Sequence, residues 1–107
     1  MDRLLQQVEQ KAIKSPQEIS AVIIAKPAKG LSPLRVNFYG DKSRSPQGRI
    51  ISYEWDFGDG DTSTKKNPRN VYWSTTFGSR YFTVTLTVRD AQGNASTDSS
   101  VIEVLGK

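Results

Sequence analysis

The sequence predicts an all-β domain, a sandwich of two antiparallel sheets with about seven strands, preceded by a short N-terminal α-helix. Two observations lead to this fold class. Apolar and polar residues alternate along several short segments, as in strands with one face in a core and the other in water. Between these segments, glycine, proline, asparagine and aspartate recur and mark turns. Together they indicate short strands joined by tight connections.

The N-terminal helix is expected within residues 1–16. Residues 2–14 are rich in helix-forming residues, and Leu4, Leu5, Val8 and Ala12 share one helical stripe. Ser15 and Pro16 end the helix, because the residue before a proline is pushed out of the α region. Residues 15–18 also fit a helix N-cap, but the β-branched run "ISAVIIA" (19–25) favours a strand. We therefore expect a lead segment at 1–16 and the sandwich domain at 17–107.

Four later segments alternate with a period of two residues. They are "LRVNF" (34–38), "ISYEWDF" (51–57), "FTVTLTVRD" (82–90) and "SVIEV" (100–104). The second segment is expected to turn Ile51, Tyr53, Trp55 and Phe57 toward the core.

Composition narrows the function classes. The 107 residues suffice for one domain and contain no cysteine and no histidine, which excludes disulfides, cysteine zinc sites and histidine general bases. The net charge of +4 is divided equally between residues 1–30 and 31–107, which argues against a nucleic-acid partner. No apolar run approaches the ~20 residues of a membrane span, and the start has no signal-peptide pattern. The strand-rich part ends almost at Lys107, so we expect a fragment of a longer protein.

The stretch "WDFGDG" (55–60) carries the most specific signal. With "PLRVNF" before it, and "NPRNVY" and "YFTVTLTVRDAQGNAS" after it, the chain resembles a PKD domain from about Ala21 to Val104. This resemblance implies an immunoglobulin-like sandwich. Two positions depart from the family pattern: Asn70 stands where histidine is frequent, and "WSTTFGSRY" (73–81) replaces a shorter turn.

The motif residues are expected to be structural. Trp55 anchors the core, Gly58 and Gly60 supply turn positions, and Asp59 accepts backbone hydrogen bonds. The resemblance assigns the motif to Trp55, Asp56, Phe57, Gly58, Asp59, Gly60, Pro68 and Tyr72. No side chain obviously acts as a base or nucleophile beside Asp56, Asp59 and Asp61, so we expect no catalytic residue and no enzyme activity.

No cofactor or metal site is expected, although calcium is an alternative. Some members of the resembled family bind calcium through acidic residues in the loop before the tryptophan strand. Here that loop, "DKSRSPQGR" (41–49), has Asp41 as its only carboxylate and three basic residues. This charge opposes a divalent cation.

A binding surface is predicted around the departing loop. Trp73, Phe77 and Tyr81 lie among small polar residues, and exposed aromatic rings stack on sugars or anchor protein interfaces. The basic residues Lys65, Lys66, Arg69 and Arg80 are expected to flank them. Two alternatives stay open: the rings cap the core, and the basic residues only keep a loop solvated.

The resemblance implies a non-catalytic extracellular or cell-surface module that mediates protein–protein or protein–carbohydrate contact within a larger protein. A purely structural spacer in a surface or envelope assembly is the alternative. Expected partners are neighbouring domains and a protein or polysaccharide ligand, without nucleic acid or membrane insertion.

Overall fold

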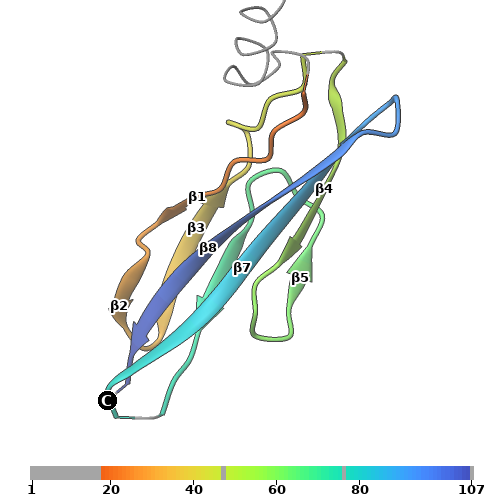
Figure 1. Cartoon of the computed structure of the whole chain (residues 1–107). Helices are drawn as coiled ribbons and strands as arrows, with labels where there is room; N and C mark the ends of the chain where they lie inside the picture. The colour runs from red at the N-terminus through yellow and green to blue at the C-terminus, as the bar shows by residue number, and fades with distance from the viewer. Residues whose placement is uncertain (1–17, 47, 76, 107) are drawn as a thin grey trace, which may run out of the picture.

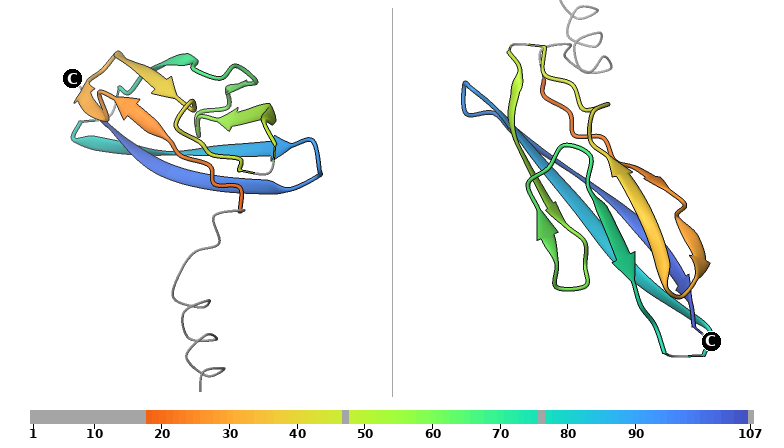
Figure 2. Two further views of the ribbon diagram at one scale, coloured as in Figure 1. Left: turned by 90° about the horizontal axis from the view of Figure 1, so that it is seen from above. Right: turned by 180° about the vertical axis from the view of Figure 1, so that it is seen from behind.

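The structure is a computed structural model that describes residues 18–46, 48–75 and 77–106. These residues form two β-sheets packed face to face (Figures 1 and 2). The prediction of a sandwich is confirmed. The predicted helix at 1–16 and the boundary at residue 17 lie outside the described residues. Within the described residues, no helix is long and apolar enough to cross a bilayer.

The described strands number eight rather than about seven. The smaller sheet has the order β1-β3-β6, with β1 at Ile24–Lys26, β3 at Leu34–Tyr39 and β6 at Arg69–Tyr72. The larger sheet has the order β2-β8-β7-β4-β5. Its strands are β2 (Lys29–Leu31), β4 (Ile50–Asp56), β5 (Thr62–Ser63), β7 (Ser79–Asp90) and β8 (Ala95–Leu105). The sheets are not purely antiparallel, because β2 runs parallel to β8.

The hairpin of β7 and β8 is the longest element and spans the length of the sandwich (Figure 1). Its turn is closed by Asp90. The carboxylate of Asp90 accepts hydrogen bonds from the backbone N–H of Gln92 (3.0 Å) and of Asn94 (2.9 Å), and from the Asn94 amide (3.1 Å). These bonds replace the backbone partners that a tight turn leaves open.

The core lies between the sheets and is built from the inward positions of the alternating strands. Aromatic rings fill its centre: Phe38 packs against Trp55 with ring centroids 5.4 Å apart, and against Phe57 at 5.1 Å. The other fully buried side chains are Val36, Tyr72, Val84, Leu86, Val88, Ile102 and Val104. The Trp55 indole N–H donates to the Lys65 carbonyl over 2.8 Å, so its polar atom is satisfied.

The prediction for Ile51 is wrong. Ile50 pairs with Asp90 and Ser52 pairs with Arg89, so β4 advances by two residues where β7 advances by one. Ile51 is therefore the extra residue of a β-bulge. The extra residue shifts the alternation, so Ile50 packs against the core and Ile51 is exposed. Tyr53 and Trp55 keep their inward placement.

The strand predicted at 19–25 is realised only in part, since β1 begins at Ile24. Before it, side chains take over the role of a neighbouring strand. The backbone N–H groups of Ala21, Val22 and Ile23 donate to Ser96 Oγ, Ser43 Oγ and Asp98 Oδ2 over 2.9–3.0 Å. The segment is therefore extended and bonded without a regular ladder.

Candidate functional site

Asp56 at the end of β4, with Asp59 and Asp61 in the turn that follows, makes hydrogen bonds within the fold. Asp56 Oδ1 accepts the N–H of Gly58 over 2.9 Å. Asp59 Oδ1 accepts the N–H of Asp61 over 3.0 Å, and its second oxygen accepts the Asn70 amide over 2.9 Å. Asn70, the departure from the family pattern, thus ties β6 to this turn. These contacts use the carboxylates of Asp56 and Asp59 to shape the loop, although both residues are exposed.

Tyr72 also stabilises this turn through a hydrogen bond. Its ring is fully buried, and its hydroxyl donates to the Phe57 carbonyl over 2.9 Å. Burial raises the pKa of Tyr72 well above its ordinary value of 10.0. The phenol is therefore protonated at neutral pH and acts as a hydrogen-bond donor. Pro68 completes the motif, since its carbonyl accepts the N–H of Phe38 over 2.8 Å.

The described residues contain no group of three or more acidic side chains placed to hold a metal ion. Both carboxylate oxygens of Asp59 already accept hydrogen bonds from protein groups. The expectation that calcium does not bind stays a prediction and is argued as such below.

Trp73, Phe77 and Tyr81 are the aromatic side chains that the structure leaves in water. Their exposed fractions are 67%, 86% and 63%. All three belong to the connection from β6 to β7 or to the first residues of β7, at the end of the sandwich where the described chain ends (Figure 1). A role in capping the core does not agree with this exposure.

Tyr81 shares the outer face of the larger sheet with two other exposed apolar side chains that were not singled out from the sequence. It pairs with Glu103 on β8 and faces outward from the larger sheet. Val101, two residues before Glu103, and Leu31, which pairs with Leu105, are also exposed and large. The alternation of "SVIEV" already indicates an outward Val101. Leu31 had no such signal, because β2 is too short to show a period.

The structure separates the basic residues that were expected to flank the aromatic loop. Arg80 lies close, with its guanidinium carbon 4.9 Å from the centroid of the Phe82 ring, where it covers the end of the core. Lys65 and Lys66 precede β6. The Lys66 carbonyl accepts the N–H of Gly40, beyond one end of β3, whereas Trp73 follows Tyr72, which pairs with Leu34 at the other end. Six residues of strand, ~20 Å, lie between these ends.

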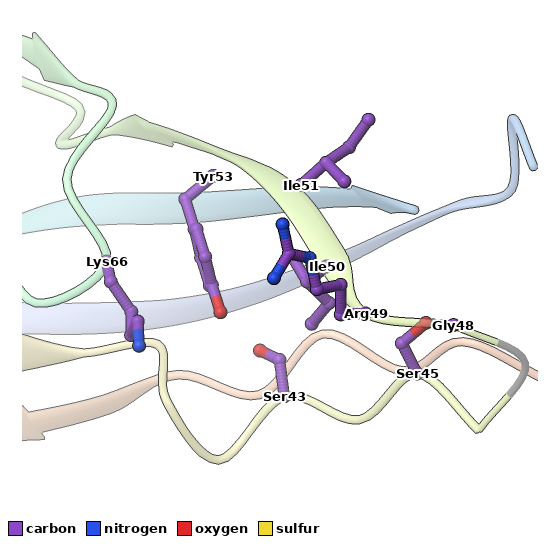
Figure 3. Close-up of a pocket in the computed structure, with 8 residues that line it drawn as sticks. All are labelled: Ser43, Ser45, Gly48, Arg49, Ile50, Ile51, Tyr53 and Lys66. Carbon is purple, nitrogen blue, oxygen red and sulfur yellow. The ribbon is translucent and has the colours of Figure 1, made fainter. Parts of the chain in front are cut away.

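Lys66 instead lines a shallow groove of about 610 Å³ beside the free edge of β4 (Figure 3). The Tyr53 ring crosses this groove and points its hydroxyl toward the loop that carries Ser43 (Figure 3). Burial, and secondarily the charge of Asp41, raise the pKa of Tyr53 above its ordinary value. The Ser45 hydroxyl, also in the lining, is buried without a hydrogen-bond partner among the described residues.

Comparisons with known proteins agree with this architecture. The sequence profile of the PKD domain family matches residues 20–104. Collagenase ColA of Bacillus cereus is 38% identical over 78 residues, which are 73% of this chain and 8% of the collagenase. The chain thus spans less than a tenth of the length of that relative.

Two solved structures share the fold at recognisable sequence identity. The PKD1 domain of the Vibrio cholerae metalloprotease PrtV is 33% identical with a TM-score of 0.67, covering 82% of this chain and 98% of that domain. A structure of carbohydrate-binding modules from the β-sandwich superfamily is 29% identical with a TM-score of 0.70, covering 87% of this chain and 36% of the other. The match to the family profile, with the buried Trp55 and its aspartate turn, shows that this chain belongs to the PKD domain family.

Proposed function

We propose that this chain is a non-catalytic accessory module of a larger extracellular protease and holds that protease on a polymeric protein substrate. The similarity to segments of a collagenase and a metalloprotease supports the first part. The internal bonding of the Asp56–Asp61 turn supports a module without chemistry of its own. Neighbouring domains of the protease are then its permanent partners.

The exposed aromatic residues carry the proposal of contact. We call the aromatic surface the set of Trp73, Phe77 and Tyr81 together with Val101 and Leu31, which lie on the same outer face of the larger sheet as Tyr81. Large apolar side chains left in water at one end of a small domain are typical of interaction sites. Tryptophan and tyrosine are also the side chains that contribute most when such a site is covered.

A sedimentation assay tests the aromatic surface. The purified chain is mixed with insoluble fibrillar collagen as the protein arm and with cellulose as the polysaccharide arm. We expect collagen to retain the chain. Trp73→Ala should weaken the retention by about tenfold or more, which corresponds to a loss of over ~1.4 kcal/mol of binding free energy. Ile51→Ala is the matched control, because Ile51 is similarly exposed at 59% but lies on the bulge of β4.

Three outcomes decide between the alternatives. Equal retention of Trp73→Ala and the parent would show that contact does not use the aromatic surface. Retention by cellulose instead of collagen would make the module a polysaccharide binder. Retention by neither would favour the spacer function, in which the domain only separates its neighbours.

A further inference from the structure

The outer face of the smaller sheet carries only positive charge. Strands β1, β3 and β6 contain the basic residues Lys26, Arg35 and Arg69 and no acidic residue. The five strands of the larger sheet contain three basic and five acidic residues. The strands of the smaller sheet therefore carry a charge of +3, and those of the larger sheet a charge of −2.

The pairing register places these cations side by side. Lys26 pairs with Asn37, and Asn37 pairs with Arg69, so these three form one row across the sheet. Arg35 lies two residues along β3 from Asn37 and points to the same face, opposite Val71. Neighbouring strands are ~4.8 Å apart and alternate residues on a strand ~7 Å apart, so the cations form a compact array.

A shallow groove runs through this array. It has a volume of about 500 Å³ and is lined by Arg35, Lys65, Arg69, Asn70 and Val71. The two ion pairs among the described residues both lie on the larger sheet, Lys29 with Glu103 and Arg89 with Glu54. The carboxylate bound to β6 is that of Asp59, held by the buried side chain of Asn70. None of the four cations of the groove and its edge forms an ion pair with a carboxylate of the described residues.

We propose that this cationic face, formed by Lys26, Arg35, Lys65 and Arg69, binds an anionic polysaccharide. Guanidinium groups bind sulfate and carboxylate oxygens with two parallel hydrogen bonds, which suits Arg35 and Arg69. A shallow groove on a sheet surface suits a chain that lies across it, with a charged group over each cation. The proposal rests on the contact role proposed above, but uses a different surface.

The chemistry between the cations argues against two other polyanions. Single-stranded nucleic acids bind where aromatic rings alternate with basic residues and stack on the bases. Here Asn37 and Val71 occupy the positions between the cations, and the aromatic ring that the register places on this face, Tyr39, is partly buried opposite Ile24 and not between two cations. A flexible acidic peptide loses conformational entropy on binding and needs apolar anchors to offset it, and the apolar side chains on this face, Ile24, Tyr39 and Val71, are all partly buried.

Heparin is the probe for the test, with the full chain and calorimetric titration at low ionic strength. We expect binding that weakens as salt is added, because screening acts on exposed charges. The double variant Arg35→Gln/Arg69→Gln is expected to weaken heparin binding by about tenfold or more. The matched control Lys29→Gln/Arg89→Gln removes the same charge from the larger sheet and is expected to change binding by less than about twofold. Both variants keep residues 1–17 unchanged.

Several results would overturn the proposal. These are no heparin binding at low salt, equal loss in the two double variants, or tighter binding of single-stranded DNA or polyglutamate with the same dependence on Arg35 and Arg69. Circular dichroism and thermal melts establish that each variant folds. Failure here leaves the collagen assay of Trp73→Ala unaffected, so the two proposals can fail separately.

Discussion

Trp55 and Trp73 are the two tryptophans of the chain, and they lie in opposite environments. Trp55 is buried against Phe38 and Phe57, whereas Trp73 is largely in water. We expect Trp55→Ala to lower the free energy of unfolding by ~3–5 kcal/mol, because it removes core contacts and leaves a cavity. Trp73→Ala is expected to change it by less than about 0.5 kcal/mol. Urea denaturation measures both, and equal midpoints for the two variants would contradict this assignment.

Gly58 and Gly60 form a matched pair for testing the turn after β4. Both have positive φ angles, of 82° and 97°. A Cβ atom on Gly58 would lie 2.4 Å from the Thr83 carbonyl oxygen, whereas one on Gly60 would meet nothing within 4 Å. We expect Gly60→Ala to lower stability by ~1–3 kcal/mol through backbone strain alone. Gly58→Ala should lower it further, because the backbone of β7 must move.

Thermal or urea unfolding of these two glycine variants distinguishes the cost of the positive φ angle from the cost of the steric clash with Thr83. Similar losses of stability in both would show that the close approach to Thr83 contributes nothing. The sequence alone indicates two turn glycines but cannot rank them. Their difference depends on β7, which lies more than twenty residues away in the chain.

Trp55 and Ile51 show what the alternation of apolar and polar residues can and cannot predict. Trp55 could be placed in the core because alternation and an aromatic motif agree. Ile51 could not be placed, because it adjoins Ile50 and either isoleucine can face inward. The bulge that decides between them is a property of the pairing with β7, and no local propensity encodes it.

Among the elements, the β7–β8 hairpin depends most on one charged residue. Burial alone would raise the pKa of Asp90, but the hydrogen bonds from Asn94 and Gln92 outweigh this and hold the pKa below its ordinary value. A folded-state pKa below the unfolded one adds stability above about pH 4, which is lost as the pH falls through the folded pKa. We expect Asp90→Asn to be less stable than the parent near neutral pH.

Urea denaturation across acidic pH tests this role of Asp90. The difference in stability between the parent and Asp90→Asn should narrow as the pH falls below about 4, where the parent carboxylate becomes protonated. A difference that stays constant down to about pH 2 would show that the charge of Asp90 does not matter, and that only its shape closes the turn.

Elements differ in how far the sequence predicts them. The part of β7 from Phe82 to Asp90 could be predicted, because its inward positions from Phe82 to Val88 are all large and apolar while threonine occupies the positions between them. Only the end of β8 was predicted. Its first half, "ASTDSS", turns Ser96 and Asp98 toward the segment before β1, where they serve as hydrogen-bond acceptors. Because these inward residues are polar, the alternation of apolar and polar residues does not reveal this half of the strand.

For the whole molecule, we expect calcium to leave stability unchanged. A ligand that binds only the native state raises stability by RT ln(1 + [L]/Kd), so a site filled at millimolar calcium would raise the melting temperature. Asp59 is already hydrogen-bonded and Asp41 has basic neighbours. Thermal melts in millimolar calcium and in EDTA should agree within about a degree. A calcium-dependent rise that disappears in Asp59→Ala or Asp41→Ala would contradict this.

The distribution of charge is a property of the whole fold that the sequence does not reveal. Dividing the chain at residue 30 gives equal charges. Strands β3 and β6 of the smaller sheet are separated along the chain by β4 and β5 of the larger sheet, so no single stretch of sequence corresponds to one face. Only the topology collects Lys26, Arg35 and Arg69 on one face. Trp73, Phe77 and Tyr81 of the aromatic surface, by contrast, lie within nine consecutive residues, so the sequence alone groups them.

The parallel pairing of β2 with β8 has a mechanical consequence. The segment leading into β2 starts at one end of the sandwich, and β8 leaves at the other (Figure 1). Tension between these ends pulls β2 and β8 in opposite directions along their own axes. The bonds that join them, such as Ser32 N–H to the Leu105 carbonyl (2.8 Å) and Glu103 N–H to the Ala28 carbonyl (2.9 Å), are then loaded together in shear. Under tension, the hydrogen bonds between β2 and β8 must therefore break together and not one at a time.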